Sequence, residues 1–303
     1  MSINIKYIND FNMLYKEQKT SIIAIFSLFF VIFSSCSNRY LLSRDYGAEL
    51  RETPRNLNQN QTTILFLIDG LSVPVFQNSL VHNNIAETQR FFSSPNGKML
   101  LGKAVFPTLT YPNITSILTA QPIHKHPIIG NKLYEKGQII NFEKPLNTQL
   151  LNRTLIGQTI FSRLAENYLK SVSLSHSFSS GANIGLGIDI EAGIAYLKED
   201  FAKVDQKIIA SLESLLTETE PTLWPHFIFV HLIGVDALSH KYGPYSPQAM
   251  QYLNQLDKEL GRIYKILART EQRGKKITSL LTSDHGFSEI KKFADLETFI
   301  NKL

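Results

Sequence analysis

Cysteine is nearly absent from this sequence, because Cys36 is the only one among 303 residues. A lone thiol cannot form an intramolecular disulfide bond, so the fold must depend on a packed core. The chain can supply that core, since 43% of its residues are hydrophobic and a chain of this length buries most of its apolar surface. We therefore expect one large globular domain.

Positive charge is also sparse and shows no clustering. The net charge is +5, with 31 basic residues scattered among 26 acidic ones, so we expect no binding to a nucleic-acid polymer. A phosphate-binding P-loop is missing as well: the glycine-rich segment 179–187 (SSGANIGLG) lacks the GK[ST] ending. We interpret that segment as a loop near the functional site.

Long hydrophobic runs are missing too. The apolar run at residues 21–33 would rise only about 20 Å as a helix, against roughly 30 Å of membrane hydrocarbon. It follows Lys16 and Lys19 and precedes Ser34, Ser35 and Cys36, a pattern typical of an export signal.

The residues Phe33 to Cys36 resemble a bacterial lipobox, in which the cysteine is acylated and becomes the mature N-terminus. We therefore predict a signal peptide at 1–35, a polar tether at 36–61 lipidated on Cys36, and a folded domain at 62–303. The protein would be an exported lipoprotein of a bacterial cell envelope, anchored to a membrane on its periplasmic side. The alternative is that Cys36 is a buried or incidental cysteine.

The hydrophobic pattern beyond the tether predicts an α/β fold. Short apolar runs at 64–68, 227–233 and 277–282 are typical of strands buried on both faces, and each is followed closely by an aspartate. Residues 201–217 and 249–267 carry apolar side chains at helical spacing. Strands alternating with helices indicate a largely parallel sheet, with ligand sites beyond the carboxyl ends of its strands.

Metal-ligand residue types follow the three predicted strands. They are Asp69, then Asp236 with His240, then Asp284 with His285. Carboxylate oxygen and imidazole nitrogen together suit zinc, with manganese or magnesium as alternatives. Taken singly, each piece has a plainer interpretation: a turn at Asp69, a helix cap at Asp236 and a polar turn at Asp284.

Five segments in order resemble the motifs of the nucleotide pyrophosphatase/phosphodiesterase (type I phosphodiesterase) family, within the alkaline phosphatase superfamily. The segments are IDG at 68–70, FPTLTYPN at 106–113, IIGN at 128–131, DALSHKYGP at 236–244 and TSDHGF at 282–287. The resemblance runs from about residue 62 to the end of the chain and implies that 62–303 is a phosphodiesterase domain. It implies an alkaline-phosphatase-like three-layer sandwich around the parallel sheet.

The resemblance also implies a set of roles around two zinc ions. One zinc would be bound by Asp69, Thr110, Asp284 and His285, and the other by Asp236 and His240. Thr110 would be the nucleophile of a phosphodiester or pyrophosphate hydrolase and would pass through a phosphothreonine. Asn131 would donate to the phosphate, and Tyr111 would lie against a nucleobase or other leaving group of a small-molecule substrate.

Two of these residues have alternative interpretations. Thr110, before Pro112 and a helical segment at 114–120, could be a helix N-cap, a role that is compatible with the nucleophile because a helix N-terminus also favours a phosphate. The ring of Tyr111 could instead be part of the core.

The sequence departs from the family pattern at its C-terminus. The resemblance implies a third protein ligand for the second zinc, a histidine roughly a hundred residues beyond His285, whereas Leu303 is the last residue here. We therefore expect an incomplete C-terminal part and a weak or empty second site. His231, inside an apolar strand, is interpreted as a core histidine or one that supports a metal ligand.

Two alternative functions remain open from the sequence, together with the oligomeric state. One is a phosphomonoesterase or phosphotransferase that uses the same residues. The other is a truncated lipoprotein without catalysis.

Overall fold

The computed structural model describes residues 60–94, 97–135, 137–144, 147–186, 194–195, 198–288 and 300. The predicted signal peptide, Cys36 and nearly all of the predicted tether lie outside these residues. Across the described ranges, no helix is both long enough and apolar enough to cross a membrane.

The centre of the structure is a five-stranded sheet in the order β5-β4-β6-β1-β7, in which every pairing is parallel. Its strands are β1 (Gln61–Ile68), β4 (Ser171–Leu174), β5 (Ile184–Gly185), β6 (Phe227–Leu232) and β7 (Lys276–Thr282). The three predicted strands are confirmed as β1, β6 and β7, and the predicted parallel α/β fold is confirmed with them.

The sequence did not reveal β4 and β5. In β4 the apolar residues alternate with serines, and all four of its residues are buried. Ser171 is buried, and its N–H is satisfied there by donating to Asn183 Oδ1 at 2.8 Å. The two-residue strand β5 lies inside the segment 179–187, so interpreting that whole segment as a loop was wrong.

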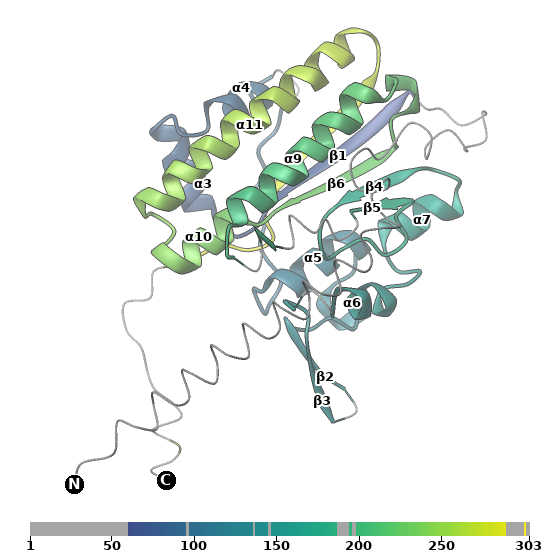
Figure 1. Cartoon of the computed structure of the whole chain (residues 1–303), viewed down its shortest axis with the longest axis vertical. Helices are drawn as coiled ribbons and strands as arrows, with labels where there is room; N and C mark the ends of the chain where they lie inside the picture. Colours follow the sequence, from purple (N-terminus) through teal and green to yellow (C-terminus); the bar gives the residue numbers. More distant parts are fainter. Residues whose placement is uncertain are drawn as a thin grey trace, which may run out of the picture. The chain divides into compact units, whose positions relative to one another are not determined.

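Helices cover both faces of the sheet and give three layers (Figure 1). On one face lie α3 (Val73–Val81), α4 (Ala86–Phe92), α9 (Phe201–Glu218), α10 (Gly234–Tyr242) and α11 (Pro247–Gln272). On the other lie α5 (Thr110–Thr119), α6 (Thr148–Thr154) and α7 (Ile160–Glu166). The hairpin of β2 (Lys132–Glu135) and β3 (Gln138–Asn141) projects from this second layer, and short 3-10 turns occupy Ile123–Lys125 and Pro221–Leu223.

Strand β1 shows why its sequence is apolar throughout. Ile64, Phe66 and Ile68 belong to the core shared with α9 and α11, whereas Leu65 and Leu67 belong to the core shared with α5 and α7. Successive side chains point to opposite faces, and both faces are covered.

Strand β7 differs, because it is the last strand of the described sheet. Its residues alternate between exposed and half-buried, and the side chain of Leu280 is 48% exposed. The prediction of burial on both faces is therefore right for β1 and β6 and wrong for β7.

The two predicted helices are confirmed as α9 and α11, each slightly longer than its apolar stripe. Helix α11 starts at Pro247, after Ser246 whose Oγ accepts from the N–H of Ala249 at 3.2 Å. A serine cap followed by proline is a common start signal.

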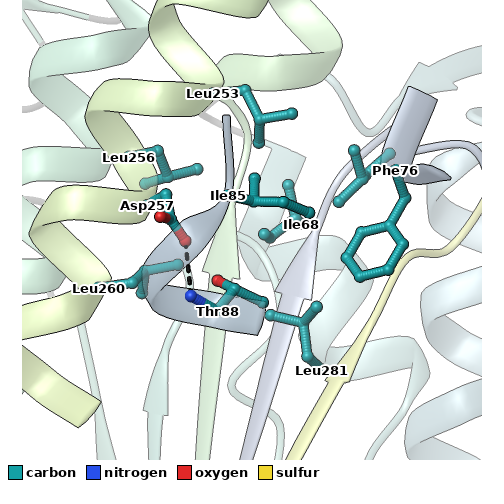
Figure 2. Close-up of a pocket in the computed structure, with 10 residues that line it drawn as sticks. Ile68, Phe76, Ile85, Thr88, Leu253, Leu256, Asp257, Leu260 and Leu281 are labelled. Atoms are coloured by element: carbon teal, nitrogen blue, oxygen red, sulfur yellow. Dashed lines mark hydrogen bonds between the residues drawn. The ribbon is translucent and has the colours of Figure 1, made fainter. Parts of the chain in front are cut away.

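A small cavity lies between β1, α4 and α11 (Figure 2). Its volume is about 10 Å³, enough for roughly one water molecule, and its lining is mostly apolar. The Asp257 carboxylate accepts from the N–H groups of Glu87 and Thr88, both at 2.8 Å, and so satisfies the start of α4. We interpret this cavity as a packing gap within the core.

Candidate active site

The sheet order brings the three predicted ligand segments to one place. Strand β1 lies between β6 and β7, and the three run parallel, so their carboxyl ends share one edge. Asp69 follows β1 directly, α10 follows β6, and Asp284 comes two residues after β7.

Asp69 and Asp284 are buried beside each other. They are 3% and 2% exposed, and the N–H of Gly70 donates to Asp284 Oδ1 at 3.2 Å. This bond ties the end of β1 to the segment after β7.

Gly70 is required by the shape of this turn. Its φ is +69°, and a Cβ there would lie 2.8 Å from Asp236 Oδ1 and 2.7 Å from the ring of Phe287. Any larger residue would therefore push Asp236 away from Asp69.

Helix α10 supplies the next two residues. The predicted helical turn is confirmed, and Asp236 Oδ2 lies 3.7 Å from His240 Nε2 on one face. Asp236 is the third helical residue and is not the helix cap. The N–H groups of Ile233 and Gly234 donate instead to the buried carboxylate of Asp205, both at 2.8 Å.

His285 lies at the centre of the site. Its Nε2 is 3.1 Å from Thr110 Oγ1, 3.4 Å from Asp69 Oδ1, 3.5 Å from Asp284 Oδ2 and 3.9 Å from Asp236 Oδ1. We call Asp69, Asp284 and His285 the buried group, and Asp236 with His240 the open group, because the His240 side chain is 69% exposed.

The charges of the site indicate a cation. Among the described atoms, Asp69 Oδ1, Asp236 Oδ1 and Asp284 Oδ2 are buried and have no hydrogen-bond partner. Burial, followed by the charges of Asp284 and Asp236, raises the pKa of Asp69 well above its usual value. Burial also raises the pKa of Asp236, although His240 and His285 oppose it.

A bound metal ion would satisfy these oxygens and favour their charged form. Ligand atoms of Asp69, Asp236 and His285 lie within 4.8 Å of one another, so the residues present fit a metal. Asp236 therefore lies close to the buried group as well as to His240.

Thr110 is the first residue of α5, and Leu109 occupies the N-cap position without a side-chain hydrogen bond. The N-cap alternative for Thr110 is therefore wrong, since its hydroxyl faces His285. Asn113 holds the preceding segment in place: its Oδ1 accepts from the N–H of Val105 at 2.7 Å, and its Nδ2 donates to the Leu109 carbonyl at 2.8 Å.

Asn131 lies next to the start of α5. Its Oδ1 accepts from the N–H of Tyr111 at 3.2 Å, and its Nδ2 donates to Glu143 Oε1 at 3.0 Å. The base of the β2–β3 hairpin brings Asn131 and Glu143 together, because the N–H of Phe142 donates to the Asn131 carbonyl at 3.0 Å.

The ring of Tyr111 is part of the core. It is 8% exposed, lies 5.7 Å from the ring of Phe142 and 5.5 Å from that of Phe178, and its hydroxyl donates to the Phe142 carbonyl at 2.7 Å. The alternative interpretation of Tyr111 from the sequence, that its ring is part of the core, is confirmed. We therefore assign no leaving-group contact to Tyr111, because these neighbours already occupy its ring.

Comparison with known proteins identifies the family. A family model described as type I phosphodiesterase / nucleotide pyrophosphatase matches residues 63–303. The chain belongs to this family.

Two curated relatives and one solved structure illustrate the similarity. Ectonucleotide pyrophosphatase/phosphodiesterase family member 1 of Homo sapiens is 26% identical over 200 residues, covering 65% of this chain and 21% of its own. Venom phosphodiesterase 2 of Crotalus adamanteus is 26% identical over 238 residues, covering 75% and 27%. The murine ectonucleotide pyrophosphatase/phosphodiesterase 5 in complex with AMP shares the fold, with a TM-score of 0.59, 16% identity, and coverage of 77% of this chain and 59% of its own.

The similarity to these relatives covers only part of their length. This chain spans about a fifth to a quarter of the two curated relatives. The five motifs of the family lie within the matched residues.

The sequence did not reveal several residues that shape this candidate site. Asp205 had a signal, since it is a charged residue at a buried position of the apolar stripe of α9. Asn113 lay inside a recognised motif without an assigned role. Glu143 had no signal, because only the hairpin brings it to Asn131.

Proposed function

We propose that this protein is a metal-dependent hydrolase of phosphodiester or pyrophosphate bonds that uses Thr110 as nucleophile. One observation carries the proposal: Thr110 Oγ1 lies 3.1 Å from His285 Nε2. That nitrogen lies within 3.9 Å of three buried carboxylate oxygens that have no hydrogen-bond partners among the described residues. The phosphodiesterases and nucleotide pyrophosphatases among its relatives support phosphodiester chemistry.

The residues of the site form two candidate sets of zinc ligands. Asp69, Asp284 and His285, with the Thr110 hydroxyl, would hold one ion. Asp236 and His240 would hold a second, more weakly, because zinc sites usually have at least three protein ligands. A bound dication lowers the pKa of a hydroxyl that it contacts and stabilises negative charge on phosphoryl oxygens.

The reaction is two displacements at phosphorus. Thr110 Oγ1 gives up its proton to the surrounding water and bonds to phosphorus, while the bond from phosphorus to the leaving oxygen breaks and that oxygen departs with its electron pair or takes a proton from water. Water then attacks the phosphothreonine, and the bond between phosphorus and Oγ1 breaks. The Thr110 side chain regains a proton, and the phosphate is released as a monoester that keeps the other substituent of the substrate.

The start of α5 contributes positive electrostatic potential to this step. Among the first residues of α5, Tyr111 donates its N–H to Asn131 and Pro112 has no N–H, so the Thr110 N–H is the group that would face a phosphate. The Asn131 amide, which donates to Glu143 at 3.0 Å, would turn its N–H toward a phosphoryl oxygen. The residues around Thr110 would thus bind the charge that develops on the substrate.

Hydrolysis of bis-p-nitrophenyl phosphate by the zinc-loaded protein tests the proposal. Thr110→Ala should lower kcat by about 10³-fold or more, because no other oxygen replaces Oγ1. Thr110→Ser should retain measurable turnover. Thr108→Ala changes an exposed threonine of the same segment and should leave kcat at the wild-type value. Full activity of Thr110→Ala would overturn the proposal. Faster release of p-nitrophenol from mono-p-nitrophenyl phosphate than from bis-p-nitrophenyl phosphate would favour a monoesterase.

The proposed location of the protein is the bacterial envelope, with a lipid anchor on Cys36. The support is the sequence pattern at residues 21–36. Cells expressing the full chain should incorporate labelled palmitate into it, and Cys36→Ser should abolish the label. Equal labelling of both proteins would contradict the anchor.

A further inference from the structure

His231 is a polar residue on an otherwise apolar strand. It belongs to β6 and is 5% exposed. The centroid of its ring lies 6.1 Å from that of Phe229, with an angle of 19° between the ring planes, and 6.3 Å from that of Phe178, with an angle of 67°. Both of its ring nitrogens have partners. Nε2 lies 3.1 Å from Asp69 Oδ2, and Nδ1 lies 3.3 Å from Ser175 Oγ.

The hydrogen bonds of Ser175 fix the tautomer of this ring. Ser175 Oγ accepts from the N–H groups of Ser177 at 3.3 Å and Phe178 at 3.2 Å. A hydroxyl has two acceptor sites and one hydrogen, so its hydrogen is directed to His231 Nδ1. The ring then carries its own hydrogen on Nε2, toward Asp69.

The ring is neutral in this arrangement, because a charged ring would carry hydrogen on both nitrogens and its Nδ1 could not accept from Ser175 Oγ. A neutral ring with hydrogen on Nε2 donates one bond and adds no positive charge beside the candidate metal.

The two oxygens of Asp69 are therefore in different situations. Oδ2 accepts from His231, whereas Oδ1 is buried without a partner among the described residues and lies 3.4 Å from His285 Nε2. Rotation of the carboxylate would break the bond to His231. Only Oδ1 is presented to the centre of the site.

We infer that Ser175 and His231 form a hydrogen-bond relay that orients Asp69 as a single-oxygen metal ligand through Oδ1. His231 is thus a positioning residue: it does not touch the substrate, and it acts through Asp69. The inference rests on the proposed function, because it requires that Asp69 binds a metal.

Zinc affinity, measured by competition with a chromophoric chelator, tests the relay. His231→Phe keeps a ring between Phe178 and Phe229 but removes the donor, and it should weaken zinc binding by about 10- to 100-fold, the usual cost of losing a partner of a metal ligand. His231→Gln places an N–H near the position of Nε2 and should restore most of the affinity. The visible spectrum of the cobalt-loaded protein should change in His231→Phe and be close to wild type in His231→Gln.

The outcomes separate this inference from the proposed function. Tight zinc binding by wild type together with equal binding by folded His231→Phe overturns the relay alone. A wild-type protein that binds no zinc overturns the proposed function, and the relay with it.

A second measurement needs no variant and so does not depend on a variant folding. Long-range nitrogen–proton NMR of the imidazole groups in the metal-free wild-type protein should show His231 with its hydrogen on Nε2. A hydrogen on Nδ1 would overturn the relay.

Discussion

The two halves of the candidate site differ in how firmly the fold holds them. The buried group lies on segments that follow two paired strands, and Asp69 and Asp284 each accept a hydrogen bond, from His231 and from the Gly70 N–H. The open group lies on one turn of α10, and its histidine is 69% exposed.

This difference shows where the site is preorganised. Ligands fixed by strand ends and buried partners lose little conformational freedom when an ion binds, whereas an exposed side chain must be ordered at that moment. We therefore expect the buried group to bind zinc more tightly than the open group. The following predictions test that contrast, from the largest effect to the smallest.

Removing one carboxylate from the buried group should have the largest effect on metal binding. In Asp284→Asn, zinc affinity should fall by at least about 100-fold, because loss of a direct ligand exceeds the 10- to 100-fold cost of losing an outer partner. Competition with a chelator measures this. Asp200→Asn, which changes an exposed cap of α9, is the matched control, and unchanged affinity in Asp284→Asn would show that the buried group is not a metal site.

Loss of the exposed histidine should affect only one ion. In His240→Ala, about one equivalent of zinc should be lost, with about tenfold or greater weakening of the second binding step, while the first remains. Metal analysis after dialysis against graded chelator measures both steps. Parallel loss of both ions would mean that the two groups form a single site.

Protons should compete with zinc for the carboxylates of Asp69 and Asp236, whose pKa values are raised. These carboxyls retain protons above the ordinary range near pH 4, so zinc must displace them, and its affinity should rise by up to about tenfold per pH unit for each proton displaced. Titration calorimetry in buffers of different ionisation enthalpy counts the protons. A zinc affinity that does not change with pH above the ordinary carboxyl range would contradict the raised pKa values.

The stability of the metal-free protein should change with pH in the opposite direction. A folded pKa raised above the unfolded value gives stability that is present at low pH and is lost as pH rises through the folded pKa. Asp236→Asn removes one such charge and should make the metal-free protein more resistant to urea at pH 7 than wild type. Lower resistance would show that Asp236 is stabilised in its charged form.

The smallest expected effect concerns Glu143. Its carboxylate accepts from Asn131 at an exposed position, so it should repel an anionic substrate weakly, and Glu143→Gln should lower KM by up to about fivefold at low salt. Steady-state kinetics at two ionic strengths measure this. An equal KM at low salt would place Glu143 away from the bound phosphate.

The sequence predicted much of the fold because hydrophobic burial repeats along the chain with the period of each element. Strands β1 and β6 are apolar on both faces, and α9 and α11 carry clear helical stripes. Strand β4 was missed because its serines are satisfied by local hydrogen bonds, which hydropathy does not record.

The residue types of the candidate site were also readable, since metal ligands come from a short list and followed recognisable motifs. Their partners were not readable. His231 reaches Asp69 only because β6 pairs with β1, and Glu143 reaches Asn131 only through the hairpin.

The sequence by itself determined the parallel α/β class and the order of the ligand segments, because burial patterns and chemical types are local properties. Thr110 became the candidate nucleophile through the resemblance of its segment to a family motif. Tertiary structure alone decided which oxygen of Asp69 faces the site, that Tyr111 belongs to the core, and that Asp236 lies near both groups. Those features depend on contacts between residues far apart in the chain, whose distances are set by strand pairing and packing.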